Sequence, residues 1–98
     1  MLSPALLGTG ARVESGARVR DSVLGRGAVV ERGAVIDAAV LHEGARVSHD
    51  STVDHAVVGR DAVVKPDVVL DALTIVGAEV TVPSGTRVSA GRFPSERE

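Results

Sequence analysis

The sequence of 98 residues contains no cysteine, tryptophan or tyrosine, and its single aromatic residue is Phe93. The absence of cysteine excludes both a disulfide framework and a thiolate metal site. Compact cores ordinarily use aromatic rings to fill volume, so this core must be built from smaller side chains. Nineteen valines and 11 glycines are present. This composition predicts β-structure around a narrow aliphatic interior.

Strong net charge and long apolar runs are also missing. The 11 basic and 13 acidic residues give a formal charge of −2, which offers no electrostatic reason to bind nucleic acid or an anionic membrane. No apolar run approaches the roughly 20 residues of a membrane span, and the first residues lack the pattern of a signal peptide. We therefore expect one soluble, cytoplasmic domain with neither nucleic acid nor membrane as a partner.

The sequence contains an internal repeat of 17 residues. Segments 7–23, 24–40 and 41–57 align without gaps, 58–75 adds one residue, and a fifth copy ends near Gly91. Each copy holds three triads that read small, any residue, aliphatic, as in Ala17-Arg18-Val19. All 15 third positions are Val, Leu or Ile, and 13 of the 15 first positions are Ala, Ser or Thr.

These triads predict the fold. In a strand, residues i and i+2 point to the same face, so the small and the aliphatic residue point inward and the middle residue points outward. Three short strands per repeat form a triangular coil, and successive coils stack as parallel strands about 4.8 Å apart. The prediction is an all-β, single-stranded parallel β-helix of about five coils and 15 short strands. Residue types that tolerate positive φ mark its corners: Gly10, Gly16, Gly27, Gly33, Gly44, Asp50, Asp61, Asp67 and Gly85.

The repeat resembles the hexapeptide-repeat, left-handed parallel β-helix family, and the left-handed winding is what this resemblance implies. A finer resemblance lies in Val19-Arg20-Asp21-Ser22-Val23-Leu24-Gly25 and Val53-Asp54-His55-Ala56-Val57-Val58-Gly59. Both are similar to the C-terminal β-helix of sugar-1-phosphate nucleotidyltransferases, which include the ADP-glucose, GDP-mannose and dTDP-glucose pyrophosphorylases. That resemblance implies a non-catalytic assembly or regulatory domain, with the chemistry in a separate nucleotide-binding domain. Gly8-Thr9-Gly10-Ala11-Arg12 fits a corner followed by a strand rather than a phosphate-binding loop, and no cofactor is expected.

The outward residues of the first triad in each coil are all large and aliphatic. They form one column, called the apolar column below: Leu6, Val23, Val40, Val57 and Ile75. The other two faces mix arginine with β-branched residues, as solvated sheet faces do. We expect the apolar column to contact a catalytic nucleotidyltransferase domain or another copy of this chain. The alternative is that β-branched residues on strands need no partner.

Three histidines are the only weak candidates for catalysis. His42, His49 and His55 fall in the three corners of the third coil, on the order of 15 Å apart, so one chain cannot bring them to one metal. Solvated corner histidines are the favoured interpretation, and neither a catalytic residue nor a metal site is assigned. The alternative is a minimal trimeric hexapeptide acyltransferase with one of these histidines as general base. A trimeric metal enzyme is a third possibility, so enzymatic activity stays open.

The C-terminal end departs from the repeat. Residues 1–94 are assigned to the β-helix, with Phe93 as a lid over Val82 and Val88, and Pro94 stops further strand pairing. Residues 95–98 are predicted to be a frayed tail.

Overall fold

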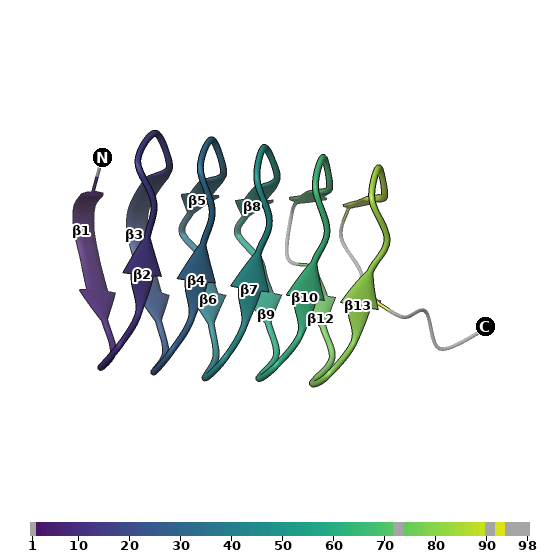
Figure 1. The fold of residues 1–98 in the computed structure, drawn as a ribbon. Helices are drawn as coiled ribbons and strands as arrows, with labels where there is room; N and C mark the ends of the chain where they lie inside the picture. Colours follow the sequence, from purple (N-terminus) through teal and green to yellow (C-terminus); the bar gives the residue numbers. More distant parts are fainter. Residues whose placement is uncertain (1, 72–73, 90–91, 94–98) are drawn as a thin grey trace.

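The computed structural model describes residues 2–71, 74–89 and 92–93. Within these ranges the chain forms parallel β-strands stacked as a solenoid of about five turns, with no helix (Figure 1). No described segment is a helix that could cross a membrane. The predicted all-β parallel β-helix is confirmed.

Fifteen strands are described. They are β1 (Leu2–Leu7), β2 (Arg12–Val13), β3 (Arg18–Leu24), β4 (Val29–Val30), β5 (Val35–Asp37), β6 (Val40–Leu41), β7 (Arg46–Val47), β8 (Thr52–Asp54), β9 (Val57–Val58), β10 (Val63–Val64), β11 (Val69–Asp71), β12 (Ile75–Val76), β13 (Thr81–Val82), β14 (Arg87–Ser89) and β15 (Arg92–Phe93).

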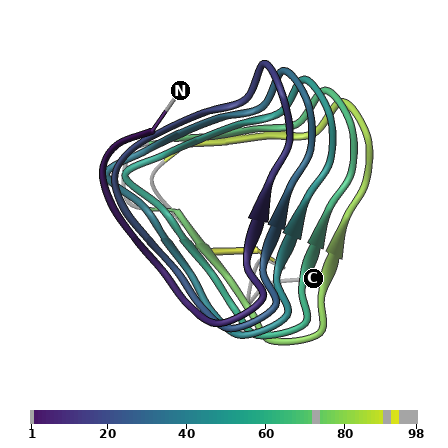
Figure 2. The ribbon, with the colours of Figure 1, turned by 60° about the vertical axis from the view of Figure 1, so that its left-hand side comes forward.

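The strands line the three sides of a triangular prism (Figure 2). The second face is a separate sheet in the order β13-β10-β7-β4-β2. The third face, β14-β11-β8-β5-β3, and the first face, β3-β6-β9-β12-β15, join through the long strand β3. The coils stack along the long axis of a molecule that measures 36 × 21 × 19 Å.

The pairing register follows the repeat. Val30 pairs with Val47 and Val47 with Val64 on the second face, a spacing of one repeat. All three valines are fully buried, and full burial of each such side chain contributes roughly 1.5–3 kcal/mol. The inward triad positions between Ala17 and Val76 are buried in the same way. A column of Val, Leu and Ile above Ala therefore fills the prism without aromatic rings.

The strand count of 15 arises differently from the prediction. The single strand β3 covers two triads, because the corner at Arg20-Asp21 is short enough for pairing to continue through it. The expectation that the repeat ends near Gly91 was wrong, since β15 pairs with β12 in the register Ile75 with Arg92 and Val76 with Phe93. Parallel pairing uses the backbone, so an atypical sequence still extends the first face. The side chain of Phe93, the end of the β-helix at Pro94 and the predicted tail 95–98 lie outside the described residues.

The corners have the predicted backbone geometry. Every glycine and aspartate expected at positive φ has it, from Gly10 at +76° to Gly85 at +78°. The shortened third corner adds Asp21, Ala38 and His55, with φ between 50° and 52°. Two residues must turn the chain there, so the second adopts the left-handed conformation even when it is alanine.

Buried polar side chains at the small triad positions have partners. Ser22 Oγ donates to the carbonyl oxygen of Arg20 and accepts the N–H of Ala39. Ser51 Oγ bridges the carbonyl oxygen of Lys65 and the N–H of Val68 in the same way. Among the described residues, no buried side-chain nitrogen or oxygen lacks a hydrogen-bond partner.

Candidate interaction surface

The apolar column lies on the first face, in continuous register. Leu6 pairs with Val23, Val23 with Val40 and Val40 with Val57, and Val57 pairs with Ile75. The exposed fractions are 70% for Leu6, 40% for Val23 and 49% for Ile75, while Val40 and Val57 are half-buried. The structure thus aligns the five predicted residues along one face and leaves them open to solvent.

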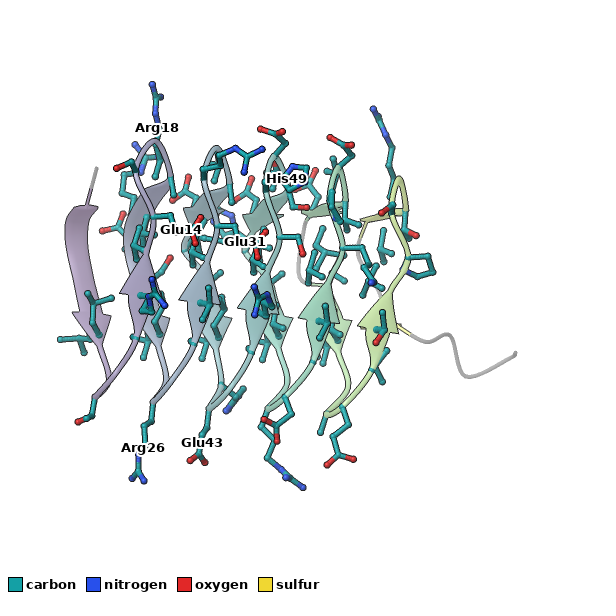
Figure 3. The ribbon with its side chains drawn as sticks, in the orientation of Figure 1. Glu14, Arg18, Arg26, Glu31, Glu43 and His49 are labelled. Carbon is teal, nitrogen blue, oxygen red and sulfur yellow. The ribbon has the colours of Figure 1, made fainter. Side chains whose placement is uncertain are left out.

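The first corner runs along one side of the apolar column. Each coil enters this corner at Gly8, Gly25, His42, Gly59 or Gly77. A Cβ on Gly25 would lie 2.7 Å from the backbone nitrogen of Glu43, so close stacking of the coils favours glycine here. His42 is the exception, and its side chain is exposed. Arg26 and Glu43 follow in consecutive coils and extend from the same corner (Figure 3).

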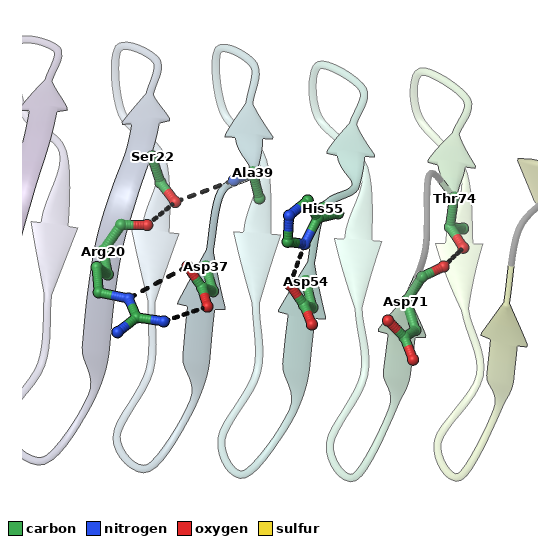
Figure 4. A network of polar contacts seen from close by, with 8 residues as sticks. All are labelled: Arg20, Ser22, Asp37, Ala39, Asp54, His55, Asp71 and Thr74. Carbon is green, nitrogen blue, oxygen red and sulfur yellow. Dashed lines mark hydrogen bonds and ion pairs between the residues drawn. The ribbon is translucent and has the colours of Figure 1, made fainter.

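The third corner runs along the other side of the column. Arg20, Asp37, Asp54 and Asp71 occupy the same position in consecutive coils (Figure 4). Arg20 Nη2 donates to Asp37 Oδ2 at 2.7 Å, and His55 Nδ1 contacts the carboxylate of Asp54. The hydrogen bonds and charge of Arg20 hold the pKa of Asp37 below its ordinary value, and Asp37 raises the pKa of Arg20.

The second corner, remote from the apolar column, carries a polar clasp between coils. Glu31 Oε2 accepts from Arg46 Nη2 at 2.7 Å, and Glu31 Oε1 accepts the backbone N–H of His49 at 3.1 Å. The hydrogen bonds from Arg46, its charge and the His49 N–H lower the pKa of Glu31. Glu14, one coil earlier, accepts the N–H of Arg32. The sequence analysis missed this clasp, although the recurrence of Glu14 and Glu31 at a spacing of 17 residues is visible in the sequence.

The three candidate histidines lie in three different corners. His42 and His55 are exposed and His49 is half-buried. His49 Nδ1 lies 3.2 Å from Asp50 Oδ2, and His55 contacts Asp54. Within the described part of the chain, no three His, Cys, Asp or Glu side chains are grouped to hold a metal ion. The histidines therefore form no joint site within one chain.

Comparison with known proteins identifies the family. The family described as GMPPB C-terminal domain matches residues 1–95. The chain belongs to the GMPPB C-terminal domain family. The resemblance to the C-terminal β-helix of nucleotidyltransferases, first seen in the repeat, is thereby confirmed.

Solved structures relate this GMPPB C-terminal domain to an acetyltransferase as well. It is similar to a histidine-to-asparagine mutant of perosamine N-acetyltransferase from Caulobacter crescentus in complex with CoA and GDP-perosamine. The identity is 31%, the TM-score is 0.60, and the match covers 97% of this chain and 51% of that one. A histidine-to-alanine mutant of GDP-perosamine N-acetyltransferase from the same organism, with the same ligands, matches at 31% identity and a TM-score of 0.61, covering 92% and 48%. The chain thus spans about half the length of these structures. No curated protein matches it.

Proposed function

We propose that this chain is the non-catalytic β-helix domain of a sugar-1-phosphate nucleotidyltransferase, and that it works by protein contact through the apolar column. The observation that carries the proposal is the family match over residues 1–95. The catalysis would belong to a separate nucleotide-binding domain, as the family resemblance implies.

The character of the two kinds of surface supports this proposal. The apolar column exposes large aliphatic side chains without interruption over five coils, and such contiguous patches mark interaction surfaces. The polar corners, by contrast, contain ion pairs within the chain, such as Arg20 with Asp37 and Arg46 with Glu31. These pairs occupy side chains that a charged substrate would need.

A second candidate function is that of a hexapeptide-repeat acyltransferase acting as a trimer. It is favoured by the likeness to the perosamine N-acetyltransferase structures, which contain CoA and GDP-perosamine. His55 would be the general base with the best geometry, because Asp54 contacts Nδ1 and a carboxylate in this place orients the imidazole with Nε2 outward. The base would have to meet its substrate at a boundary between subunits, since the three histidines of one chain lie apart.

Two measurements separate these functions. Calorimetric titration with acetyl-CoA should give no binding for the proposed assembly domain. Binding that disappears in His55→Ala, His42→Ala or His49→Ala would overturn the proposal in favour of the acyltransferase.

The assembly itself is tested by substitution at the centre of the column. Val40→Asp should abolish association with a nucleotidyltransferase catalytic domain or with another copy while the circular dichroism spectrum stays unchanged. Val35→Asp is the matched control, because Val35 is an outward valine of the third face with 37% exposure. Association retained in Val40→Asp would contradict the proposal.

A further inference from the structure

We propose that the partner of the apolar column is a second copy of this chain, packed antiparallel, with the two-fold axis crossing the coil of Val40. This inference rests on the proposed function, because it names the partner of the same surface. The axis lies in the plane of the face and runs along the strand direction, so each corner meets the same corner of the other copy.

The apolar column is symmetric about Val40. It has a bulky side chain at each end, Leu6 and Ile75, and three valines between them in continuous register. In a two-fold contact, if residue i touches residue j of the partner, then j touches i. Reversal of the column places Leu6 on Ile75 of the second copy, Val23 on Val57 and Val40 on itself. Both bulky, most exposed ends are covered by this arrangement.

Charges at the first corner fit the same axis. In the central coil, His42 and Glu43 lie beside the axis, so each histidine faces the glutamate of the other copy. The coil of Val23 meets the coil of Val57, which brings Arg26 opposite Asp61. Arg60 lies between two acidic groups of its own chain, 3.8 Å from Asp61 and 3.9 Å from Glu79. The acidic groups near Arg60 thus make this coil a suitable counterpart for Arg26.

Charges at the third corner agree as well. The same meeting of coils places Arg20 of one copy opposite Asp54 of the other, and the symmetry repeats this pair. Asp37 meets its own symmetry mate, but each Asp37 is already paired with Arg20 at 2.7 Å. Opposite charges therefore flank the apolar column on both sides in the antiparallel arrangement.

A parallel arrangement is disfavoured by the same residues. An axis along the solenoid would place the third corner of each coil against the first corner of the same coil. Arg20 would then face Arg26, and Asp37 would face Glu43. Like charges brought together across an interface cost free energy, so the charge pattern selects the antiparallel dimer.

The size of the face sets the expected strength. The molecule is 36 Å long and at most 21 Å wide, so one face is comparable with the roughly 800 Å² per partner that a standard interface buries. We expect a reversible dimer whose population depends on protein concentration.

Single-cysteine variants test the arrangement directly, because the natural chain contains no cysteine. Sheets that pack face to face lie about 10 Å apart, beyond the span of a disulfide, so a short bis-maleimide crosslinker is the appropriate reagent. Val40→Cys should form a crosslinked homodimer. A mixture of Leu6→Cys and Ile75→Cys should give the heterodimer, identified by mass, and neither variant alone should crosslink. Val35→Cys is the control on another face.

A charge swap provides a second readout that does not depend on cysteine chemistry. Arg20→Asp should weaken the dimer by about tenfold or more, since each of two symmetric contacts loses an opposite-charge pair. Arg20→Asp combined with Asp54→Arg should restore the dissociation constant to within about threefold of the natural chain. Thermal unfolding of both variants confirms that they are folded.

The outcomes are distinct. Homodimers of Leu6→Cys would show a parallel arrangement and overturn the inference, as would crosslinking of Val40→Cys no greater than that of Val35→Cys. If Val40→Cys does not crosslink but Val40→Asp still abolishes binding to a catalytic domain, the inference fails and the proposed function stands.

Discussion

At the scale of single residues, close stacking of the coils determines which side chains the corners accept. Gly25 has an ordinary negative φ, yet a Cβ there would lie 2.7 Å from the nitrogen of Glu43 and 2.8 Å from the carbonyl carbon of His42. The requirement for glycine at this position is therefore steric. At Gly27 the requirement is conformational, since φ is +71° and the space beside the backbone is open.

This distinction gives a matched pair of substitutions. Gly25→Ala should lower the free energy of unfolding by about 1–3 kcal/mol, the usual cost of overpacking. Gly27→Asn should change it by less than about 1 kcal/mol, because asparagine tolerates the left-handed conformation. Urea unfolding monitored by circular dichroism measures both. Equal stability of the two variants would contradict the steric account of Gly25.

Ala38 carries the opposite consequence. Its φ of +51° places a Cβ in a conformation that costs an L-residue roughly 1–2 kcal/mol. Ala38→Gly should therefore raise the free energy of unfolding by about 0.5–1 kcal/mol, even after the greater freedom of glycine in the unfolded chain is counted. The neighbouring change Ala39→Gly, at a buried triad position, should be destabilising. A higher melting temperature in the first variant and a lower one in the second would bear this out.

At the scale of strands and corners, ion pairs connect consecutive coils and make stability depend on pH. Glu31 and Asp37 both have a pKa below their ordinary values because arginines of neighbouring coils donate to them. A carboxylate with a lowered pKa in the folded state contributes stability above its ordinary pKa, and that contribution is lost as the pH falls through the folded-state pKa. Acid should therefore loosen the contacts between coils.

Glu31→Gln isolates this charge, because the amide oxygen of glutamine can still accept the N–H of His49. The variant should lose up to about 1 kcal/mol of stability at pH 7, as expected for a partly exposed ion pair. Its stability should then match that of the natural chain below the ordinary glutamate pKa of about 4.3. Unfolding free energies measured between pH 7 and acid test this, and a difference that stays constant with pH would contradict it.

Much of this level of structure was predictable from the sequence, for identifiable reasons. The inward positions, the registers of 17 residues and the positive φ of Gly10 or Asp50 all follow from a repeat whose every copy obeys the same alternation. The left-handed conformation of Ala38 and His55 was not predicted, because alanine and histidine carry no sign of it and the length of the corner decides. The Glu31 clasp with Arg46 depends on side-chain rotamers, which no repeat specifies. The pairing of Arg92 and Phe93 was missed because backbone pairing needs no triad.

At the scale of the whole molecule, the chain is a narrow prism with an aliphatic interior and three different faces. Its apolar column is continuous and exposed, its ion pairs are turned to the other chain's coils or to solvent at the corners, and its histidines are separated. Membership of the GMPPB C-terminal domain family and this distribution of side chains together favour assembly over catalysis as the role of the domain. The column is symmetric about Val40, which makes a second copy the natural partner.

The most direct test of this account is the molar mass in solution, measured by light scattering over a range of concentrations, for the natural chain and for Val40→Asp. The account predicts that the natural chain rises from its monomer mass of 10.0 kDa towards twice that value as concentration increases. Val40→Asp should remain at the monomer mass with an unchanged circular dichroism spectrum. Equal masses for the two proteins at every concentration would contradict the claim that the apolar column joins two copies.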